Sequence, residues 1–246
     1  MTSRCAVGAY LLVKPGPMLE PGVLTASACL ADMAPDCWAI EWVSTREGER
    51  EERADRLGIH RADLPGVVRW ATDHFDGGGF AWPNVFCTRD TANQFRRQFS
   101  PQGVHLLGIG LPLDLVDAFL GLTAPPRKQP GYAPVGPTGV YDVLRERQPL
   151  APGGAGRGYE VLGIDEAGQF CSFRCNQLED EFRRLFGATF NAWGLIDDEA
   201  MARACAEYAS GPEVGTCARA WHPWFVEEYP LQGSTRRAFG EPAAAS

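Results

Sequence analysis

The sequence predicts an α/β or α+β fold, built as two similar small domains that each combine a sheet with helices. Residues 7–22 (VGAYLLVKPGPMLEPG) align without gaps on residues 138–153 (TGVYDVLRERQPLAPG), so that Tyr10 falls on Tyr141. A fixed offset between matching segments is typical of an internal duplication. Five prolines within residues 121–137 separate the two copies, and proline suits a linker because it interrupts both helices and strands.

These observations divide the chain into four parts. They are an N-terminal α/β domain at residues 1–122, a Pro/Gly-rich linker at 123–137, a related C-terminal domain at 138–230 and a tail at 231–246. The chain has 246 residues, which is enough for two domains of ordinary size, and 45% of them are hydrophobic, which supplies a core. Two such domains are expected to leave a groove between them.

In the first half, apolar and β-branched runs bounded by Gly and Pro predict strands, whereas apolar residues spaced three or four apart predict helices. Asp63 is the N-cap of one helix, and a later helix turns Ala92, Phe95 and Phe99 inward. The predicted strands are residues 7–13, 38–43, 84–88 and 105–109, and the predicted helices are residues 63–75, 89–100 and 113–122.

The second half is expected to repeat this plan. Asn176 caps a helix, with Glu179 three residues on in a capping-box arrangement, and Asp197 caps another. The first of these helices buries Phe182 and Phe186. The predicted strands are residues 140–144, 159–164, 169–175 and the aromatic-rich segment 221–229.

The charge and hydropathy of the chain narrow its possible partners. A net charge of −8 disfavours binding to nucleic acid, which needs a clustered basic face, and suits a protein that meets a basic partner. The apolar run at residues 5–13 is followed by Lys14 without a signal-peptide cleavage pattern. The longest apolar run, residues 106–122, contains Pro112 and Asp114 and cannot span a bilayer. The sequence therefore predicts a soluble, cytoplasmic protein without a membrane partner.

The eight cysteines have irregular spacing and are interpreted as reduced core residues, so no metal or cofactor is predicted. A zinc site is the alternative, because thiolate and imidazole are zinc ligands. Its four ligands would be Cys171, Cys175, Cys217 and His222. Their spacing argues against it, since two strand residues four positions apart are separated by about 13 Å.

A cysteine nucleophile is a second alternative. Cys175 directly precedes the helix expected to be capped by Asn176, where the helix dipole would lower its thiol pKa. His222 or His105 would be the partner base, and Gln169 or Asn176 would stabilise an oxyanion. No local signature surrounds this cysteine, so a buried thiol is the preferred interpretation.

Aromatic residues in expected loops indicate a surface for recognising a protein. Phe80 and Trp82 follow three glycines, and Trp221 and Trp224 lie in the aromatic segment near the C-terminus. The neighbouring carboxylates would steer a basic partner toward this surface. They belong to Glu227 and Glu228.

The leading functional hypothesis is a non-enzymatic binding protein, most concretely a bacterial immunity or antitoxin-like inhibitor of a protein partner. It follows from the acidic charge, the aromatic segments and the lack of a catalytic or cofactor motif. The alternative is a cysteine- or zinc-dependent enzyme that works in the inter-domain groove through Cys175 and His222. A small-molecule sensor that uses the same groove is a third possibility.

Overall fold

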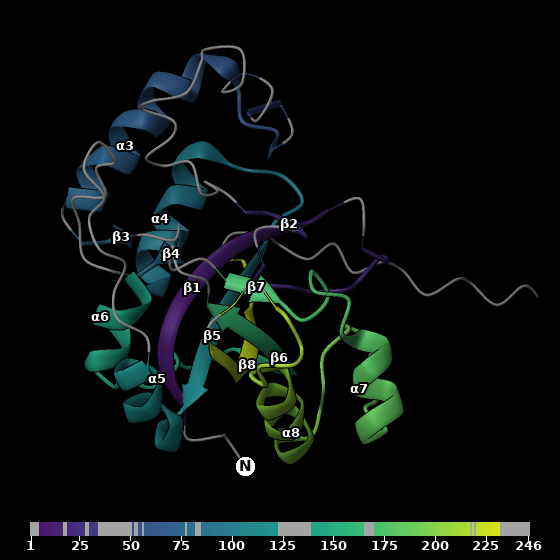
Figure 1. Cartoon of the computed structure of the whole chain (residues 1–246). Helices are drawn as coiled ribbons and strands as arrows, with labels where there is room; N and C mark the ends of the chain where they lie inside the picture. The colour runs from purple at the N-terminus through teal and green to yellow at the C-terminus, as the bar shows by residue number, and fades with distance from the viewer. Residues whose placement is uncertain are drawn as a thin grey trace, which may run out of the picture.

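Four long strands form the middle of a sheet in the computed structural model of the chain (Figure 1). The structure describes residues 5–16, 19–27, 30–33, 51, 54–55, 57–76, 78–81, 85–122, 139–164, 170–216, 218 and 220–231. The long strands are β1 (Cys5–Pro15), β5 (His105–Pro112), β6 (Ala155–Ile164) and β8 (Ala220–Tyr229). Most of their residues are buried on both faces of the sheet, which explains why they form nearly continuous apolar runs.

The sheet is antiparallel and continues across both halves of the chain. Its order is β3-β4-β1-β5-β8-β6-β7, and β2 pairs with β1. The short strands are β2 (Ala31–Met33), β3 (Phe80–Ala81), β4 (Val85–Phe86) and β7 (Phe170–Ser172). β5 pairs with β8, from Leu106 opposite Tyr229 to Gly110 opposite Phe225. The fold is therefore α+β, and the two halves contribute to one sheet instead of forming one sheet each.

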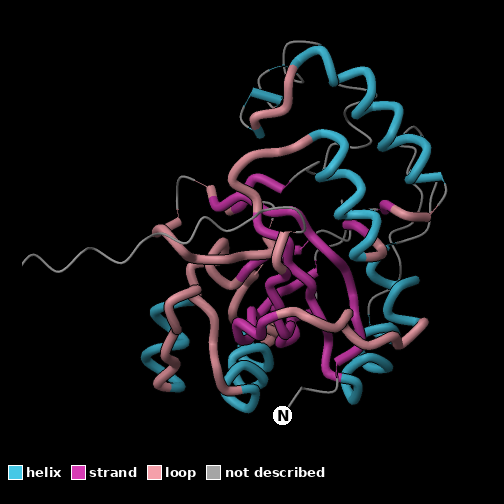
Figure 2. Tube along the Cα trace, turned by 180° about the vertical axis from the view of Figure 1, so that it is seen from behind, coloured by secondary structure: helices cyan, strands magenta, loops and turns pink. Residues whose placement is uncertain are grey.

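Helices cover both faces of this sheet (Figures 1 and 2). Buried side chains of α5 and α6 pack on one face, and those of α3, α4, α7 and α8 pack on the other. The helices are α3 (Leu64–Asp76), α4 (Arg89–Phe99), α5 (Val116–Leu122), α6 (Gly139–Arg145), α7 (Glu179–Phe186) and α8 (Glu199–Ala209), with single 3-10 turns at Arg61–Asp63 and Leu113–Leu115. None of the described helices is long and apolar enough to cross a membrane.

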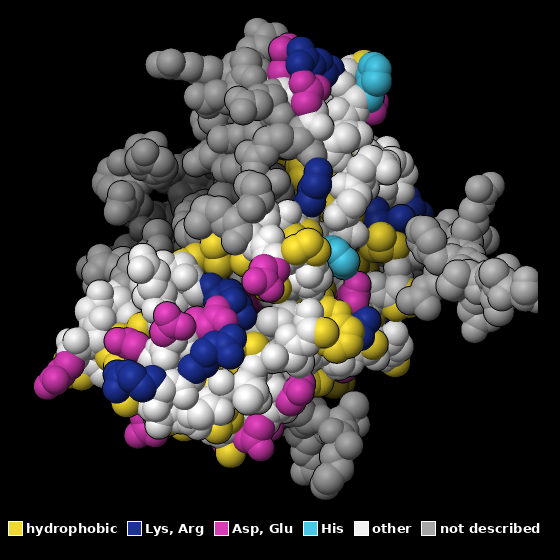
Figure 3. Space-filling model, turned by 90° about the vertical axis from the view of Figure 1, so that its right-hand side faces the viewer, with side chains coloured by type: hydrophobic (Ala, Val, Ile, Leu, Met, Phe, Trp, Pro, Cys, Tyr) yellow, Lys and Arg dark blue, Asp and Glu magenta, His cyan; other side chains and the backbone are white. Residues whose placement is uncertain are grey.

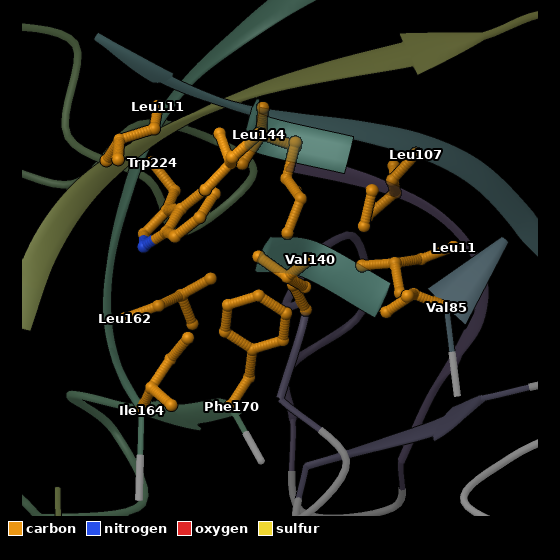
Figure 4. Close-up of a cluster of buried hydrophobic side chains, with 14 of the residues drawn as sticks. Leu11, Val85, Leu107, Leu111, Val140, Leu144, Leu162, Ile164, Phe170 and Trp224 are labelled. Carbon is orange, nitrogen blue, oxygen red and sulfur yellow. The ribbon is translucent and has the colours of Figure 1, made fainter. Parts of the chain in front are cut away.

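The face under α5 and α6 holds a large apolar cluster, in which side chains of the central strands meet those of α6 (Figure 4). Trp224 belongs to this cluster and is fully buried, with its ring centroid 5.5 Å from that of Phe119. A Cβ atom on Gly8 would lie 2.5 Å from the Trp224 ring, so this position of β1 requires glycine. Close packing of this kind makes Trp224 a central residue of the core.

The predicted strand at residues 140–144 is wrong, because this segment forms α6. Val140, Tyr141 and Leu144 are buried together, and their spacing fits one face of a helix. Tyr10 lies in β1 and Tyr141 in α6, so the two matching segments fold differently and the internal duplication is not seen. The predicted strand at 38–43, the linker at 123–137 and the tail from residue 232 lie outside the described residues.

The helix predicted after Asn176 begins later than expected. Residues 173–177 form turns, Gln177 has a φ of 59°, and α7 starts at Glu179. Phe182 is buried as expected, whereas Phe186 is partly buried. Asp198 rather than Asp197 caps α8, because its carboxylate accepts a hydrogen bond from the amide of Met201.

Candidate binding groove between α4 and α6

After α6 the chain crosses one face of the sheet, and we call residues 146–154 the crossing segment. Two tyrosines of the sheet hold it in place. The hydroxyl of Tyr10 accepts a hydrogen bond from the Ala151 amide at 3.0 Å. The hydroxyl of Tyr229 lies 2.9 Å from the Ala151 carbonyl and shares its single proton between that oxygen and a carboxylate oxygen of Glu227. Because both backbone groups of one residue are bonded to side chains of the sheet, the middle of the segment has a defined position.

The strand beneath the crossing segment leaves room for it. A Cβ atom on Gly108 would lie 2.8 Å from the Tyr229 ring and 3.1 Å from Leu150 of the segment. A side chain at this point would displace one of the two. Steric contact with the crossing segment therefore explains why glycines interrupt the apolar run of β5.

An open groove with a volume of about 570 Å³ lies beside the crossing segment. Its size falls in the range of pockets that take small ligands. β1 contributes the floor, the start of α4 one wall, and α6 with the crossing segment the opposite wall. The lining residues are Val7, Tyr10, Gly78, Cys87, Thr88, Arg89, Asp90, Asp142, Val143, Glu146, Gln148, Pro149 and Ala151.

Among the described residues that line the groove, more side chains are negative than positive. Asp90 lies in the first turn of α4, Asp142 in α6 and Glu146 just after α6, whereas Arg89 is the cation of the lining set. The side of the molecule that carries α7 differs, because acidic and basic side chains lie interspersed there (Figure 3). An excess of carboxylates around a hollow creates a potential that attracts cations.

Arg89 is engaged by the structure around the groove. Its Nη1 atom donates a hydrogen bond to the Pro152 carbonyl at 2.7 Å. Its guanidinium carbon also lies 5.1 Å from the centroid of the Tyr229 ring, a cation–π arrangement. These contacts fix the arginine against the crossing segment.

The pKa of the Cys87 thiol reflects the burial and the negative charge of the groove. Cys87 is partly exposed, and burial together with the charge of Asp142 raises its pKa to about 11. The thiol is therefore protonated at neutral pH and is a weak nucleophile. Cys87 lines the groove without the activation that a catalytic cysteine needs.

The two tyrosines beneath the crossing segment are also poor acid–base catalysts. Burial raises the pKa of Tyr10 and of Tyr229, and the hydrogen bond to Glu227 adds to the effect at Tyr229. The Tyr229 hydroxyl lies 2.7 Å from Oε2 of Glu227, which accepts its hydrogen bond. Both phenols stay neutral and hold the crossing segment in place.

A second polar cluster surrounds Glu160 on the other face of the sheet. This carboxylate is fully buried and accepts hydrogen bonds from the Thr25 hydroxyl at 2.6 Å and from the Ala26 amide at 2.8 Å. Burial raises the pKa of Glu160, and these hydrogen bonds partly oppose the increase. The cluster ties residues 23–27 to β6. Its described members are buried, so the described part of the structure shows no opening to it for a ligand.

The predicted aromatic surface is corrected by the positions of its members. Trp221 and Trp224 are 3% and 0% exposed and belong to clusters on opposite faces of the sheet. Phe80 is fully buried in β3, and Trp82 lies outside the described residues. The strand predicted at residues 221–229 forms β8, but because β8 is a central strand of the sheet it buries both Trp221 and Trp224. Buried side chains cannot anchor a partner on the folded surface.

The two predicted carboxylates also point to opposite faces. Glu227 is buried and bonded to Tyr229. Glu228 accepts a hydrogen bond from His105 at 2.9 Å and forms an ion pair with Arg157 at 2.7 Å. Neither carboxylate extends freely toward a partner.

The cysteine alternative loses its activating helix. Because α7 begins at Glu179, Cys175 lies in a turn, and its Sγ atom is 3.0 Å from the Ser27 hydroxyl. Burial lowers the pKa of His222 to about 4, and its Nε2 atom has no hydrogen-bond partner within the described structure. A neutral imidazole of such low basicity does not activate a thiol.

The proposed zinc ligands do not converge. Cys171 packs with α7 and α8, whereas His222 lies on the opposite face with its ring centroid 5.4 Å from that of Phe119. Cys217 lies outside the described residues. Among the residues that the structure describes, no group of three or more His, Cys, Asp and Glu side chains could hold a metal ion.

No protein-family model, curated protein or solved structure matches this chain. The groove must therefore be judged by its own residues. The sequence patterns did not indicate Asp90, Asp142 or Glu146 as site residues. Because residues 140–144 were predicted as a strand, the four-residue spacing between Asp142 and Glu146 had no apparent meaning. That spacing would have placed both carboxylates on one helical face.

Proposed function

We propose that this chain is a non-enzymatic binding protein and that it inhibits a protein partner which docks into the groove between α4 and α6. A bacterial immunity or antitoxin-like inhibitor is the concrete form of the proposal. The complex is expected to form in the cytoplasm, without nucleic acid, metal or cofactor.

The observation that carries this proposal is the open groove, whose described lining holds three carboxylates and one engaged arginine. An acidic hollow favours docking of a basic partner and speeds the encounter with it. The groups that would be expected to carry catalysis are unsuited to it, because Cys87 has a raised pKa and His222 a lowered one. Binding therefore accounts for the groove better than catalysis does.

The test is to fill the groove and measure whether a partner is still retained and inhibited. Gln148 is an exposed lining residue, so Gln148→Trp places a bulky ring in the groove without disturbing the core. Gln94→Trp is the matched control, because Gln94 is exposed on α4 and does not line the groove. The purified proteins are immobilised and exposed to extract of the source cells, and each retained protein is then assayed with and without the chain.

We expect a partner protein that the native chain and Gln94→Trp both retain and inhibit. Gln148→Trp should retain at least tenfold less of that protein. Equal retention by Gln148→Trp would contradict docking at the groove. A retained protein whose activity is unchanged by the chain would contradict inhibition.

A further inference from the structure

We infer that the groove receives a lysine or arginine side chain of the partner, with its charged head among the groove carboxylates and its stem on Val143 and Pro149. This inference deepens the proposed function and rests on it. It assigns a ligand chemistry to the cavity: a guanidinium or ammonium group on a flexible alkyl chain.

The first step is that the described lining of the groove contains carboxylates without a cationic partner. Within the described part of the chain, the carboxylates of Asp90 and Glu146 form no side-chain hydrogen bond or ion pair. Asp142 is paired with Arg145, an arginine whose side chain is half exposed at the surface. A surface pair of this kind contributes little free energy and exchanges readily for another cation.

The second step is that the cation of the groove lining does not compete for these acids. Arg89 donates to the Pro152 carbonyl at 2.7 Å and lies over the Tyr229 ring. It remains against the crossing segment, so an incoming cation meets described lining residues whose net charge is negative. An anionic ligand would meet the same carboxylates and be repelled.

The third step is the apolar part of the lining. Val143, which is half-buried, and Pro149, which is exposed, offer carbon surface beside the carboxylates, above a floor of Val7 and Tyr10. Lysine and arginine have apolar stems that lie on such surface while their charged ends reach polar groups. The combination of apolar floor and acidic wall matches this two-part side chain better than it matches a compact metal ion.

The α4 N-terminus does not provide an anion site that would favour the opposite charge. The Thr88 hydroxyl accepts a hydrogen bond from the Thr91 amide, so the first turn is capped by the chain itself. Asp90 in the same turn adds a negative charge. The cap satisfies one amide of the first turn, and the Asp90 carboxylate offsets the positive end of the helix dipole.

The experiment uses Cys87 as a reporter inside the groove. N-acetyl-arginine methylamide is titrated against the native chain while a methanethiosulfonate reagent modifies thiols, and mass spectrometry follows the rate at Cys87. N-acetyl-citrulline methylamide is the matched neutral probe, because it has nearly the same shape without the charge. Asp142→Asn/Glu146→Gln removes two groove charges, and Asp73→Asn/Asp180→Asn removes two exposed charges elsewhere.

The arginine probe is expected to slow modification of Cys87 with half-saturation at millimolar concentration, about tenfold below that of the citrulline probe. Asp142→Asn/Glu146→Gln should abolish the tenfold preference, and Asp73→Asn/Asp180→Asn should retain it. Equal protection by both probes, or no protection by either at about 50 mM, would overturn the inference.

These outcomes are distinguishable from failure of the proposed function. If Gln148→Trp loses the partner but the two probes protect equally, the groove docks a protein without recognising a cationic side chain. If the arginine probe is selective but Gln148→Trp keeps the partner, the cation site exists and the docking proposal fails.

Discussion

Polar groups in the core under α5 and α6 have different surroundings from those in the groove beside the crossing segment. On the face under α5 and α6, Glu160 and His222 are buried, Glu160 opposite Trp224 in the sheet and His222 against Phe119. On the other face the crossing segment leaves a groove, and the carboxylates of Asp90 and Glu146 remain unpaired among the described residues. Both faces derive from the same strands, so the difference arises from what covers them.

This contrast separates polar groups that hold the fold from groups that are available to a ligand. Glu160 is buried together with its donors, and a buried carboxylate needs such partners to offset the cost of desolvation. The groove carboxylates stay hydrated and contribute little to folding. Substitutions on the enclosed face should therefore change stability, and substitutions in the groove should change binding.

Truncation of the core tryptophan should have the largest effect. Trp224→Ala removes a fully buried ring from the enclosed face and should lower the free energy of unfolding by about 4 kcal/mol. Glu146→Ala in the groove should change it by less than about 0.5 kcal/mol. Urea unfolding followed by fluorescence measures both. A small loss for Trp224→Ala would show that the enclosed face is not a packed core.

The buried histidine should make the protein acid-sensitive. Burial lowers the pKa of His222 to about 4, below the ordinary value of 6.5, so the unfolded chain binds a proton that the folded chain does not. Stability from this group is present above pH 6.5 and is lost as the pH falls toward 4, by about 3 kcal/mol in total. His222→Phe should remove this slope from urea unfolding measured across that range. His60→Gln, which alters an exposed histidine, should keep it.

The buried carboxyl of Glu160 should change the free energy of unfolding with pH in the opposite direction from His222. Burial raises the pKa of Glu160, so the folded chain holds a proton that the unfolded chain releases above the ordinary value of 4.5. Its contribution to stability is greatest at low pH and declines as the pH rises from 4.5 through the raised pKa. Glu160→Gln keeps the shape of the side chain and should lose this decline. An identical pH profile for native protein and Glu160→Gln would show that Glu160 is not buried as described.

Sequence patterns correctly predicted those helices and strands in which the spacing of apolar residues matches the face that is buried. The helix with Ala92, Phe95 and Phe99 inward is confirmed as α4, and the strand starting at His105 as β5. The α+β class is also confirmed. These elements follow local rules of spacing and capping, which a sequence displays directly.

The groove could not be predicted because it depends on contacts between distant residues. Tyr10 and Ala151 are 141 positions apart, and no local pattern announces their hydrogen bond. The aromatic segment was misread for a related reason, since Trp221 and Trp224 alternate between the faces of a central strand and both are buried. Periodicity indicates the type of an element, but its neighbours determine whether a face is exposed.

The smallest effect concerns the field inside the groove. Burial is the main cause of the raised pKa of Cys87, and the negative charge of Asp142 is a further cause. Asp142→Asn should therefore lower this pKa while leaving it above the ordinary value of 9 for a thiol. The rate of thiol modification at Cys87, measured against pH, should shift toward lower pH in Asp142→Asn and stay unchanged in Asp73→Asn. The free energy of unfolding should change by less than about 0.5 kcal/mol in both variants. An unchanged pH profile of Cys87 modification in Asp142→Asn would show that the Asp142 carboxylate does not influence the groove electrostatically. The contrast between an enclosed core and a negatively charged groove would then be contradicted.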